Sequence, residues 1–508
     1  MTSKYIVYGS GRYARARFVV PAALLLFGIL FASLGDAAPK SVPSKKPRKP
    51  VKQAETRKAE IPAPSPEKRE AGPVELSLPP VTEFELENGM KVFYIRDELP
   101  QFSIVASAGF GKLYEGRLNA GISDLLARAL TLGGSKRYPG DRLHEAVESV
   151  GGRIAISASW ETVNISIRVL ERHADLALDI MTDLLSDPAL DERSIADARA
   201  MLVEEIRRKM DSPSTLAVEK VREIIFDGTG YGSVPNEQSV NSISQAELRT
   251  AFNNHFRAAN MAVGVVGSPG AEEARIRVEK ALSGIERGAR VAYRFDAVKA
   301  AAAVRAGTKK IYFIERPVPQ ATIVIGTLAP PLADPASSSL GVMNFILGEG
   351  SFSSRLVREI RVNRGLSYVV QSVLRQRKDT GVFLAFAQTN TAQSPLTLRL
   401  ILENMDKIAS APVTADELAW ARQSMINSYI FEFETPLAVL EKYMTVYHMG
   451  LPFSYITGYQ RNIAGVGADA VLDGAKKLFG QGSVRLVLGE ASLKKELARF
   501  GEVVVVRP

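Results

Sequence analysis

The 508-residue sequence contains no cysteine, so disulfide bonds, thiol nucleophiles and cysteine metal sites are excluded. Histidine is also scarce. The four histidines are His144, His173, His255 and His448, and no two of them are four positions apart. A pair of histidines on one helix face, the usual start of a helical zinc site, is therefore missing. We expect each histidine to lie on the surface or to pack against a helix.

A basic surface on the folded part of the chain is missing as well. Lys and Arg (64) exceed Asp and Glu (55) by nine. Residues 1–73 hold 14 basic and 5 acidic residues, so the whole surplus lies there and the rest is neutral. The sequence therefore predicts no nucleic-acid groove and no nucleic-acid partner.

The basic N-terminus precedes a short apolar run at Phe18–Leu34, followed by the small residues Gly35 and Ala37. This pattern predicts a cleaved export signal over residues 1–37, with a retained membrane anchor as the alternative. Because no cysteine follows the run, a lipoprotein is excluded. We expect an exported, periplasmic protein.

Residues 38–80 are rich in proline and lysine and nearly free of large apolar side chains. Such a segment cannot bury a core, so we predict a disordered linker there.

The remaining sequence contains an internal repeat. "KVFYIRDELPQFSIV" from Lys91 matches "KIYFIERPVPQATIV" from Lys310 at an offset of 219. Further on, Pro213 matches Pro436 at an offset of 223, and Phe256 matches Phe479 at the same offset. We therefore predict a duplicated domain, with homologous units at residues 81–290 and 309–508.

Both units have the same order of hydrophobic patterns. Short β-branched and aromatic runs open each unit, helical periodicity follows, and a late strand closes it. These patterns predict an α+β fold in which helices cover a mixed, mostly antiparallel sheet in each unit. The expected strands are residues 91–95, 102–106 and 261–267 in the first unit and 310–314, 322–326 and 484–490 in the second. Long helices are expected over 192–210 and 415–433.

From Val81 onward the chain resembles the pitrilysin/insulinase family of zinc peptidases, which includes mitochondrial processing peptidase. The resemblance lies in "FELENGMKVFYI", in "NNHFRAANMAVGVVG" and above all in "GEGSFSSRLVREIRVNRGLSYVV". It implies two homologous α/β halves that form half of a clamshell closing around a peptide.

The family's zinc motif, H-x-x-E-H, falls on a stretch that has lost it. In "AGISDLLARALTLGG" the ligand positions are Asp124 and Arg128, and the general-base position is Ala127. Arginine remains protonated and has no lone pair to offer a metal. The third ligand position is retained as Glu205, which we expect to be solvated or salt-bridged. The resemblance therefore implies a degenerate site that holds no metal or other cofactor.

The second unit departs less from the family pattern. There the resemblance implies substrate contacts by Arg361 and by Tyr368, seven residues later, with Gly365 ending the helix between them. Alternatively, Arg361 pairs with Glu359 or a carboxylate across the cleft, and Tyr368 is a half-buried sheet residue. The glycines of the turn at 348–350 either let the backbone approach a peptide or end a helix; the substrate-contact hypothesis includes Gly348 and Gly350.

These features predict a non-catalytic, peptide-binding subunit. It would pair with a homologue that carries H-x-x-E-H and the zinc, supply the arginine and tyrosine wall of the chamber, and bind extended peptides. The alternative is an exported structural or peptide-holding scaffold unrelated to proteolysis. The missing ligands argue against an autonomous peptidase.

Overall fold

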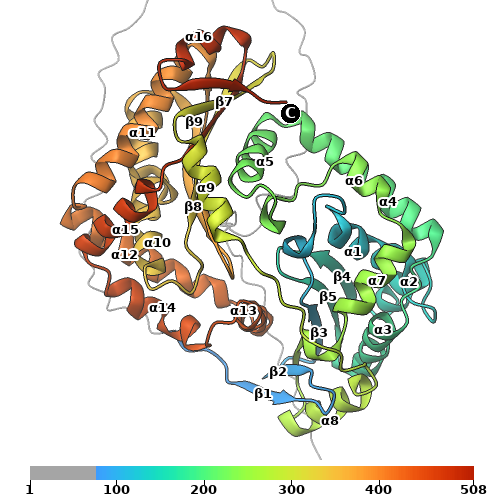
Figure 1. Ribbon diagram of the computed structural model, residues 1–508. Helices are drawn as coiled ribbons and strands as arrows, with labels where there is room; N and C mark the ends of the chain where they lie inside the picture. The colour runs from blue at the N-terminus through green and yellow to red at the C-terminus, as the bar shows by residue number, and fades with distance from the viewer. Residues whose placement is uncertain (1–75, 508) are drawn as a thin grey trace, which may run out of the picture. The chain divides into compact units, whose positions relative to one another are not determined.

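A computed structural model describes residues 76–507 (Figure 1). The expectations for the export signal and for residues 38–75 lie outside this range, and residues 76–80 have no regular secondary structure. Within the described range, no helix combines the length and apolarity that crossing a membrane requires.

The first half alternates strands and helices. Its strands are β1 (Val81–Glu85), β2 (Lys91–Arg96), β3 (Gln101–Ala108), β4 (Arg153–Ala158), β5 (Val163–Leu170) and β6 (Met261–Gly267). Its helices are α1 (Ile122–Gly133), α2 (Asp141–Glu148), α3 (Ala174–Ser186), α4 (Glu192–Asp211), α5 (Pro213–Ile225), α6 (Glu237–Ser242), α7 (Gln245–His255) and α8 (Ala271–Leu282).

Helix α9 (Ala297–Gly307) connects to the second half. The strands there are β7 (Lys310–Glu315), β8 (Gln320–Ala329), β9 (Ser367–Gln376), β10 (Gly381–Asn390), β11 (Val484–Gly489) and β12 (Glu502–Val505). The α-helices are α10 (Ser337–Asn344), α11 (Ser394–Ser410), α12 (Ala415–Tyr429), α13 (Pro436–His448), α14 (Ser454–Ala464), α15 (Ala468–Gly480) and α16 (Lys494–Leu497). Two segments are π-helical, η5 (Phe345–Glu349) and η7 (Val357–Asn363).

Each half contains one mixed, mostly antiparallel sheet of six strands, which confirms the predicted fold class. The strand orders are β1-β2-β6-β3-β5-β4 and β12-β7-β11-β8-β10-β9. Parallel pairing is confined to β2 with β6 in the first sheet, and to β7 with β11 and β12 in the second. The expectation that the strand at 484–490 closes the second half was wrong, because α16 and β12 follow and β12 pairs with β7.

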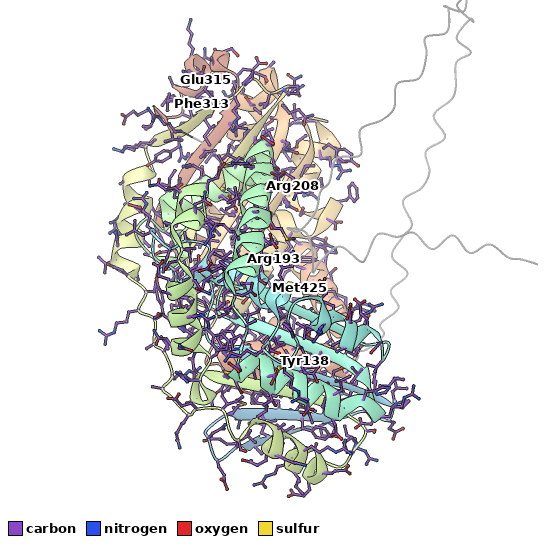
Figure 2. All side chains as sticks on the ribbon, turned by 90° about the vertical axis from the view of Figure 1, so that its right-hand side faces the viewer. Tyr138, Arg193, Arg208, Phe313, Glu315 and Met425 are labelled. Carbon is purple, nitrogen blue, oxygen red and sulfur yellow. The ribbon has the colours of Figure 1, made fainter. Side chains whose placement is uncertain are left out.

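Helix α4 illustrates how the helices divide between core and solvent. Its apolar side chains, such as Leu202 and Ile206, are buried, whereas Arg193 and Arg208, near its two ends, are exposed (Figure 2). The apolar side packs against α1. Glu205 therefore lies at the border of the buried stripe, on the side that faces α1.

The two halves exchange one helix each. The apolar side of α5, from the first half, packs against β8 and β11 of the second sheet. In return, α13 packs against β2 and β6 of the first sheet. The exchanged helices occupy equivalent positions in the repeat, since Pro213 and Pro436 are the first residues of α5 and α13.

This exchange explains why β6 is apolar and buried along its whole length. In β6, Val263 and Val265 face the core of the first half, whereas Ala262 and Val266 contact α13. A strand that is covered on both faces has no solvent-exposed side, so its sequence does not alternate between apolar and polar residues.

Two strand glycines allow the exchanged helices to come close. A Cβ atom at Gly264 would lie 2.6 Å from Leu440 of α13, and one at Gly326 would lie 2.6 Å from Val221 of α5. A larger residue at either position would push the helix off the sheet.

Truncating Leu440 to alanine should destabilise both halves together. Leu440 is fully buried against the first sheet although it belongs to the second half, so the cavity should lower the free energy of unfolding by about 2–5 kcal/mol. Urea unfolding measured for native chain and variant checks this. The control is Leu118→Ala, because Leu118 is 87% exposed. Two separate transitions, with only one of them shifted, would contradict the exchange as the link between the halves.

Candidate functional site

The degenerate zinc positions lie on α1 where it faces α4. The chain enters α1 through Gly121 at φ 95° and leaves it at Gly134 with φ 63°, both in the left-handed region that favours glycine. Asp124 and Arg128, one turn apart, remain partly exposed, whereas Ala127 is buried in the core of the first half. The structure therefore places these three positions on the side of α1 that meets α4, where Arg128 contacts Glu205.

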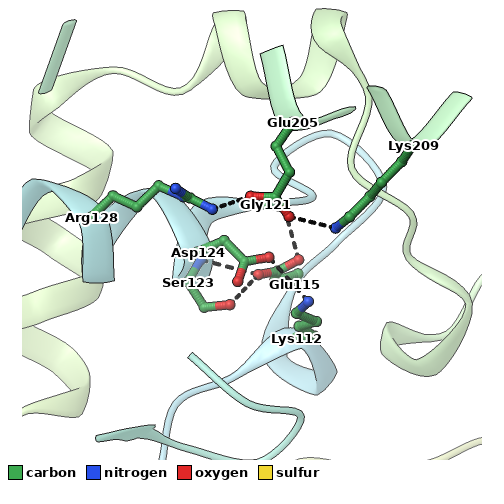
Figure 3. A network of polar contacts seen from close by, with 8 residues as sticks. All are labelled: Lys112, Glu115, Gly121, Ser123, Asp124, Arg128, Glu205 and Lys209. Atoms are coloured by element: carbon green, nitrogen blue, oxygen red, sulfur yellow. Dashed lines mark hydrogen bonds and ion pairs between the residues drawn. The ribbon is translucent and has the colours of Figure 1, made fainter. Parts of the chain in front are cut away.

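Ion pairs occupy this site (Figure 3). The guanidinium of Arg128 donates to Oε2 of Glu205, and Nζ of Lys209 lies 2.8 Å from Oε1 of the same carboxylate. Nζ of Lys112 lies 3.1 Å from Oδ2 of Asp124. Each carboxylate at a former ligand position thus has a cation of the chain itself as its partner.

The charges fix the ionisation of Glu205. Partial burial opposes ionisation, but the hydrogen bond and charge of Lys209, together with the charges of Arg128 and Lys112, outweigh it and lower the pKa of Glu205. The carboxylate is therefore ionised at neutral pH and is paired, in agreement with the salt-bridged role expected from the sequence.

Glu115 is a member of this network that sequence reasoning missed. Its buried carboxylate accepts hydrogen bonds from the backbone N–H of Gly121 at 2.8 Å and of Ser123 at 3.0 Å, and from the Ser123 hydroxyl. It thus satisfies N–H groups at the start of α1. Burial raises the pKa of Glu115, and these hydrogen bonds offset only part of that effect. The sequence signal that could have identified Glu115 is an acidic residue shortly before the start of a helix.

Zinc does not fit these residues. Arg128 places a guanidinium against Glu205, where a metal would require a ligand with a free lone pair. Ala127 offers no base to activate water. Across residues 76–507, no cluster of three or more His, Asp or Glu side chains is arranged to hold a metal ion.

The second candidate site lies around the turn between η5 and η7. π-Helical segments are rare and occur often at functional sites. Between the two, Ser351 adopts φ 51°, a left-handed conformation that non-glycine residues seldom occupy. Unusual backbone is therefore concentrated immediately before Arg361.

A bidentate ion pair anchors this segment to α12. The Arg355 guanidinium donates to both carboxylate oxygens of Glu417, at 2.7 and 2.8 Å. Glu417 also forms the capping box of α12 with Thr414. Hydrogen bonds from Arg355 outweigh the effect of burial and, with the backbone N–H of Thr414, lower the pKa of Glu417 from 4.5 to about 2.

Arg361 and Tyr368 meet, and Phe352 joins them. The guanidinium carbon of Arg361 lies 4.4 Å from the ring centroid of Tyr368 and 4.8 Å from that of Phe352. Gly365 has φ 60° and turns the chain from η7 into β9, as predicted. The structure does not support pairing of Arg361 with Glu359, because Glu359 binds Arg364 instead. Nor is Tyr368 half-buried, since it is 78% exposed.

The glycines at 348 and 350 are buried against the chain itself. A Cβ atom at Gly348 would lie 2.5 Å from the backbone nitrogen of Ser372, and one at Gly350 would meet the ring of Trp420. Close packing within the second half accounts for both glycines. Contact of Gly348 or Gly350 with a peptide stays a prediction.

The degenerate zinc site and the arginine–tyrosine site belong to different halves. Within residues 76–507, no hydrogen bond or ion pair joins Asp124, Arg128 or Glu205 to Arg361 or Tyr368. Among the described residues, the two sites are therefore separate, and Arg361 of the second site has no ion-pair partner there.

Two family models match the sequence. Residues 92–234 match "Insulinase (Peptidase family M16)" and residues 242–425 match "Peptidase M16 inactive domain". An uncharacterized zinc protease of Streptomyces coelicolor is 24% identical over 330 residues, which are 63% of this chain and 70% of that protein. Subunit 1 of the mitochondrial cytochrome b-c1 complex of Bos taurus is 24% identical over 275 residues, 54% of this chain and 56% of that one.

The same fold occurs in solved structures. The crystal structure of a peptidase M16 inactive domain from Pseudomonas fluorescens superposes with a TM-score of 0.73 at 20% identity. It covers 81% of this chain, and 98% of its own length is matched.

Restoring the motif should restore zinc binding. Asp124→His, Ala127→Glu and Arg128→His together would place two imidazoles one turn apart beside Glu205 and remove the competing guanidinium. We expect about one zinc ion per chain in the triple variant and none in the native protein, measured by metal analysis after dialysis. Glu205→Gln in the triple background is the control and should lower the zinc content. Stoichiometric zinc in the native protein would contradict the degenerate site.

The Arg355–Glu417 pair should make stability depend on acidic pH. The folded pKa of Glu417 lies below its unfolded value, so its contribution is complete above about pH 4.5 and is lost as the pH falls towards 2. The lowered pKa of Glu417 corresponds to a contribution of about 3 kcal/mol to the free energy of unfolding. The difference in unfolding free energy between native chain and Glu417→Gln should therefore narrow over this range.

The matched control for this pH series is Glu434→Gln, which changes an exposed residue. A gap between native chain and Glu417→Gln that stays constant from pH 5 to pH 2 would show that the pair does not determine the ionisation of Glu417.

Proposed function

The chain belongs to the insulinase (M16) family of peptidases, and we propose that it acts there as a non-catalytic, peptide-binding subunit. Its partner would be a homologue carrying H-x-x-E-H. The observation that carries the proposal is the contrast between the two sites. The zinc positions are closed by ion pairs, whereas Tyr368 is exposed and the partly exposed Arg361 has no carboxylate partner within residues 76–507.

This contrast fits a division of labour between two chains. A chain with Ala127 in place of a general base cannot activate water in the family's manner. Arg361, held beside two exposed rings and without an ion-pair partner within residues 76–507, keeps its N–H donors available for a peptide. The catalytic half of the chemistry is therefore assigned to the partner, and the binding half to this chain.

The side chains of Arg361 and Tyr368 carry hydrogen-bond donors of the kind that peptide hydrolysis requires. The planar fork of donors on Arg361 matches a peptide carbonyl, and the Tyr368 hydroxyl can donate to an oxyanion that develops on the scissile carbonyl. The partner would hold the zinc and its general base. Residues 1–37 supply the expectation that this assembly lies in the periplasm, with a possible anchor in the membrane.

A second candidate is a scaffold without any role in proteolysis. It is favoured by the similarity to subunit 1 of the mitochondrial cytochrome b-c1 complex, whose name describes a component of a complex and not a peptidase. In that case Arg361 and Tyr368 would contact another subunit or a held peptide.

Co-purification and one hydroxyl deletion test the proposal. The chain should co-elute with an H-x-x-E-H homologue from the native host when the two are sized together. Tyr368→Phe should leave this assembly intact but lower peptide turnover by the complex about 100- to 1000-fold, the typical cost of one oxyanion donor. Arg361→Ala should weaken peptide binding more than it weakens assembly. Tyr138→Phe, on the first half, is the control (Figure 2).

The results separate the two candidates. Normal assembly with unchanged turnover in both variants would rule out a role of these residues in the chemistry. Failure to co-elute with any H-x-x-E-H homologue, together with unaltered activity of that homologue, would favour the scaffold.

A further inference from the structure

Phe352 is an exposed aromatic residue to which the proposed function gives no task. It is 61% exposed, yet its ring lies against the guanidinium of Arg361, whose other aromatic contact is Tyr368. A large aromatic ring left in water is costly, and surface aromatic clusters commonly mark binding sites.

The backbone that presents Phe352 is held in a costly conformation. Ser351, directly before it, lies in the left-handed region, and Ser354 closes a short turn by donating its hydroxyl to the Ser351 carbonyl at 2.7 Å. Backbone strain of this kind persists where the surrounding structure enforces it, often at ligand sites. The fold therefore fixes the position of this ring.

The charge beside the ring is not neutralised by the chain. The nearest acidic residues in sequence are occupied. Glu359 binds Arg364 at 2.8 Å, and Glu349 is bonded to Asn344 at 2.8 Å. Within residues 76–507, no ion pair involves Arg361.

This arrangement selects a particular kind of ligand group. Aromatic rings contact the face of a guanidinium, whereas its N–H donors point outward in the guanidinium plane. The planar acceptor that matches two of these donors and also cancels the charge is a carboxylate. A neutral carbonyl can accept hydrogen bonds from these donors but leaves the positive charge of the guanidinium uncompensated.

We infer that Phe352, Arg361 and Tyr368 form one recognition site that selects peptides carrying a carboxylate, either an Asp or Glu side chain or a free C-terminus. The inference rests on the proposed function, in which this surface faces a peptide. Phe352 is then a specificity-determining residue, because its ring holds the guanidinium with the donor edge outward.

Three labelled peptides of one unstructured, neutral sequence test the inference on the full-length chain. The first has a central Glu and an amidated C-terminus, the second has Gln and an amidated C-terminus, and the third has Gln and a free C-terminus. At low salt we expect one or both carboxylate peptides to bind about tenfold more tightly than the Gln amide. The advantage should fall as ionic strength rises, since the site is exposed. The two carboxylate peptides together tell which source is preferred.

Variants of Phe352 provide the specific readout. Phe352→Leu keeps an apolar side chain but removes the π face, and should weaken carboxylate binding about two- to fivefold. Phe352→Trp should retain the native preference. Phe431→Leu is the control, because Phe431 is 67% exposed elsewhere in the second half and should have no effect.

Equal binding of all three peptides, or a preference that Phe352→Leu leaves unchanged, would overturn the inference. If Arg361→Ala then still weakens every peptide to the same degree, the proposed peptide-binding role stands without carboxylate selection. If Arg361→Ala changes no peptide's binding, both the inference and the site assignment fail.

Discussion

The reciprocal exchange of α5 and α13 is the constraint on which the rest of the structure depends. Each sheet has one face covered by its own helices and the other by a helix of the opposite half. Neither sheet can bury both faces alone, so neither half is a complete core. The exchange also determines the unusual residues at the contact, namely the glycines in β6 and β8 and the uninterrupted apolar sequence of β6. Both candidate sites are positioned on this shared framework.

The two sites show opposite solutions to the same problem of placing a charge near the surface. On α1 and α4, each carboxylate of the degenerate metal site is paired with a lysine or an arginine of the chain. Neither carboxylate is therefore left without a cation. Around η7, the guanidinium of Arg361 is held by aromatic rings, which fix its position without neutralising it. A duplicated unit has thus become a closed, self-paired surface in one copy and an open, charged surface in the other.

Sequence patterns located six of the twelve strands found within residues 76–507 and did not predict which elements pack together. The period of the apolar residues located β2, β3, β7 and β8, and the repeat register identified two equivalent halves. The same patterns could not show that the apolar side of α5 faces the sheet of the other half, because an amphipathic stripe does not specify its partner. β12 was missed because its four residues, EVVV, follow β11, the strand that was expected to close the second half.

For the candidate sites as well, the sequence predicted some features and could not predict others. The identity of residues 124, 127 and 128 argues against a zinc site directly, since ligand chemistry depends on residue type. The contact of Phe352 with Arg361 depends on the left-handed Ser351 and on two π-helical segments, and local sequence does not encode these clearly.

The guanidinium of Arg128 has a consequence for how this chain matures in the cell. A metallopeptidase fold with an intact motif exists in loaded and unloaded forms, and its Glu ligand is a buried charge in need of a cation until the ion arrives. Here the cation is the guanidinium of Arg128, which is covalently part of the chain. The ionic partner of Glu205 is therefore present as soon as the chain folds, and the pairing of this carboxylate requires no metal ion.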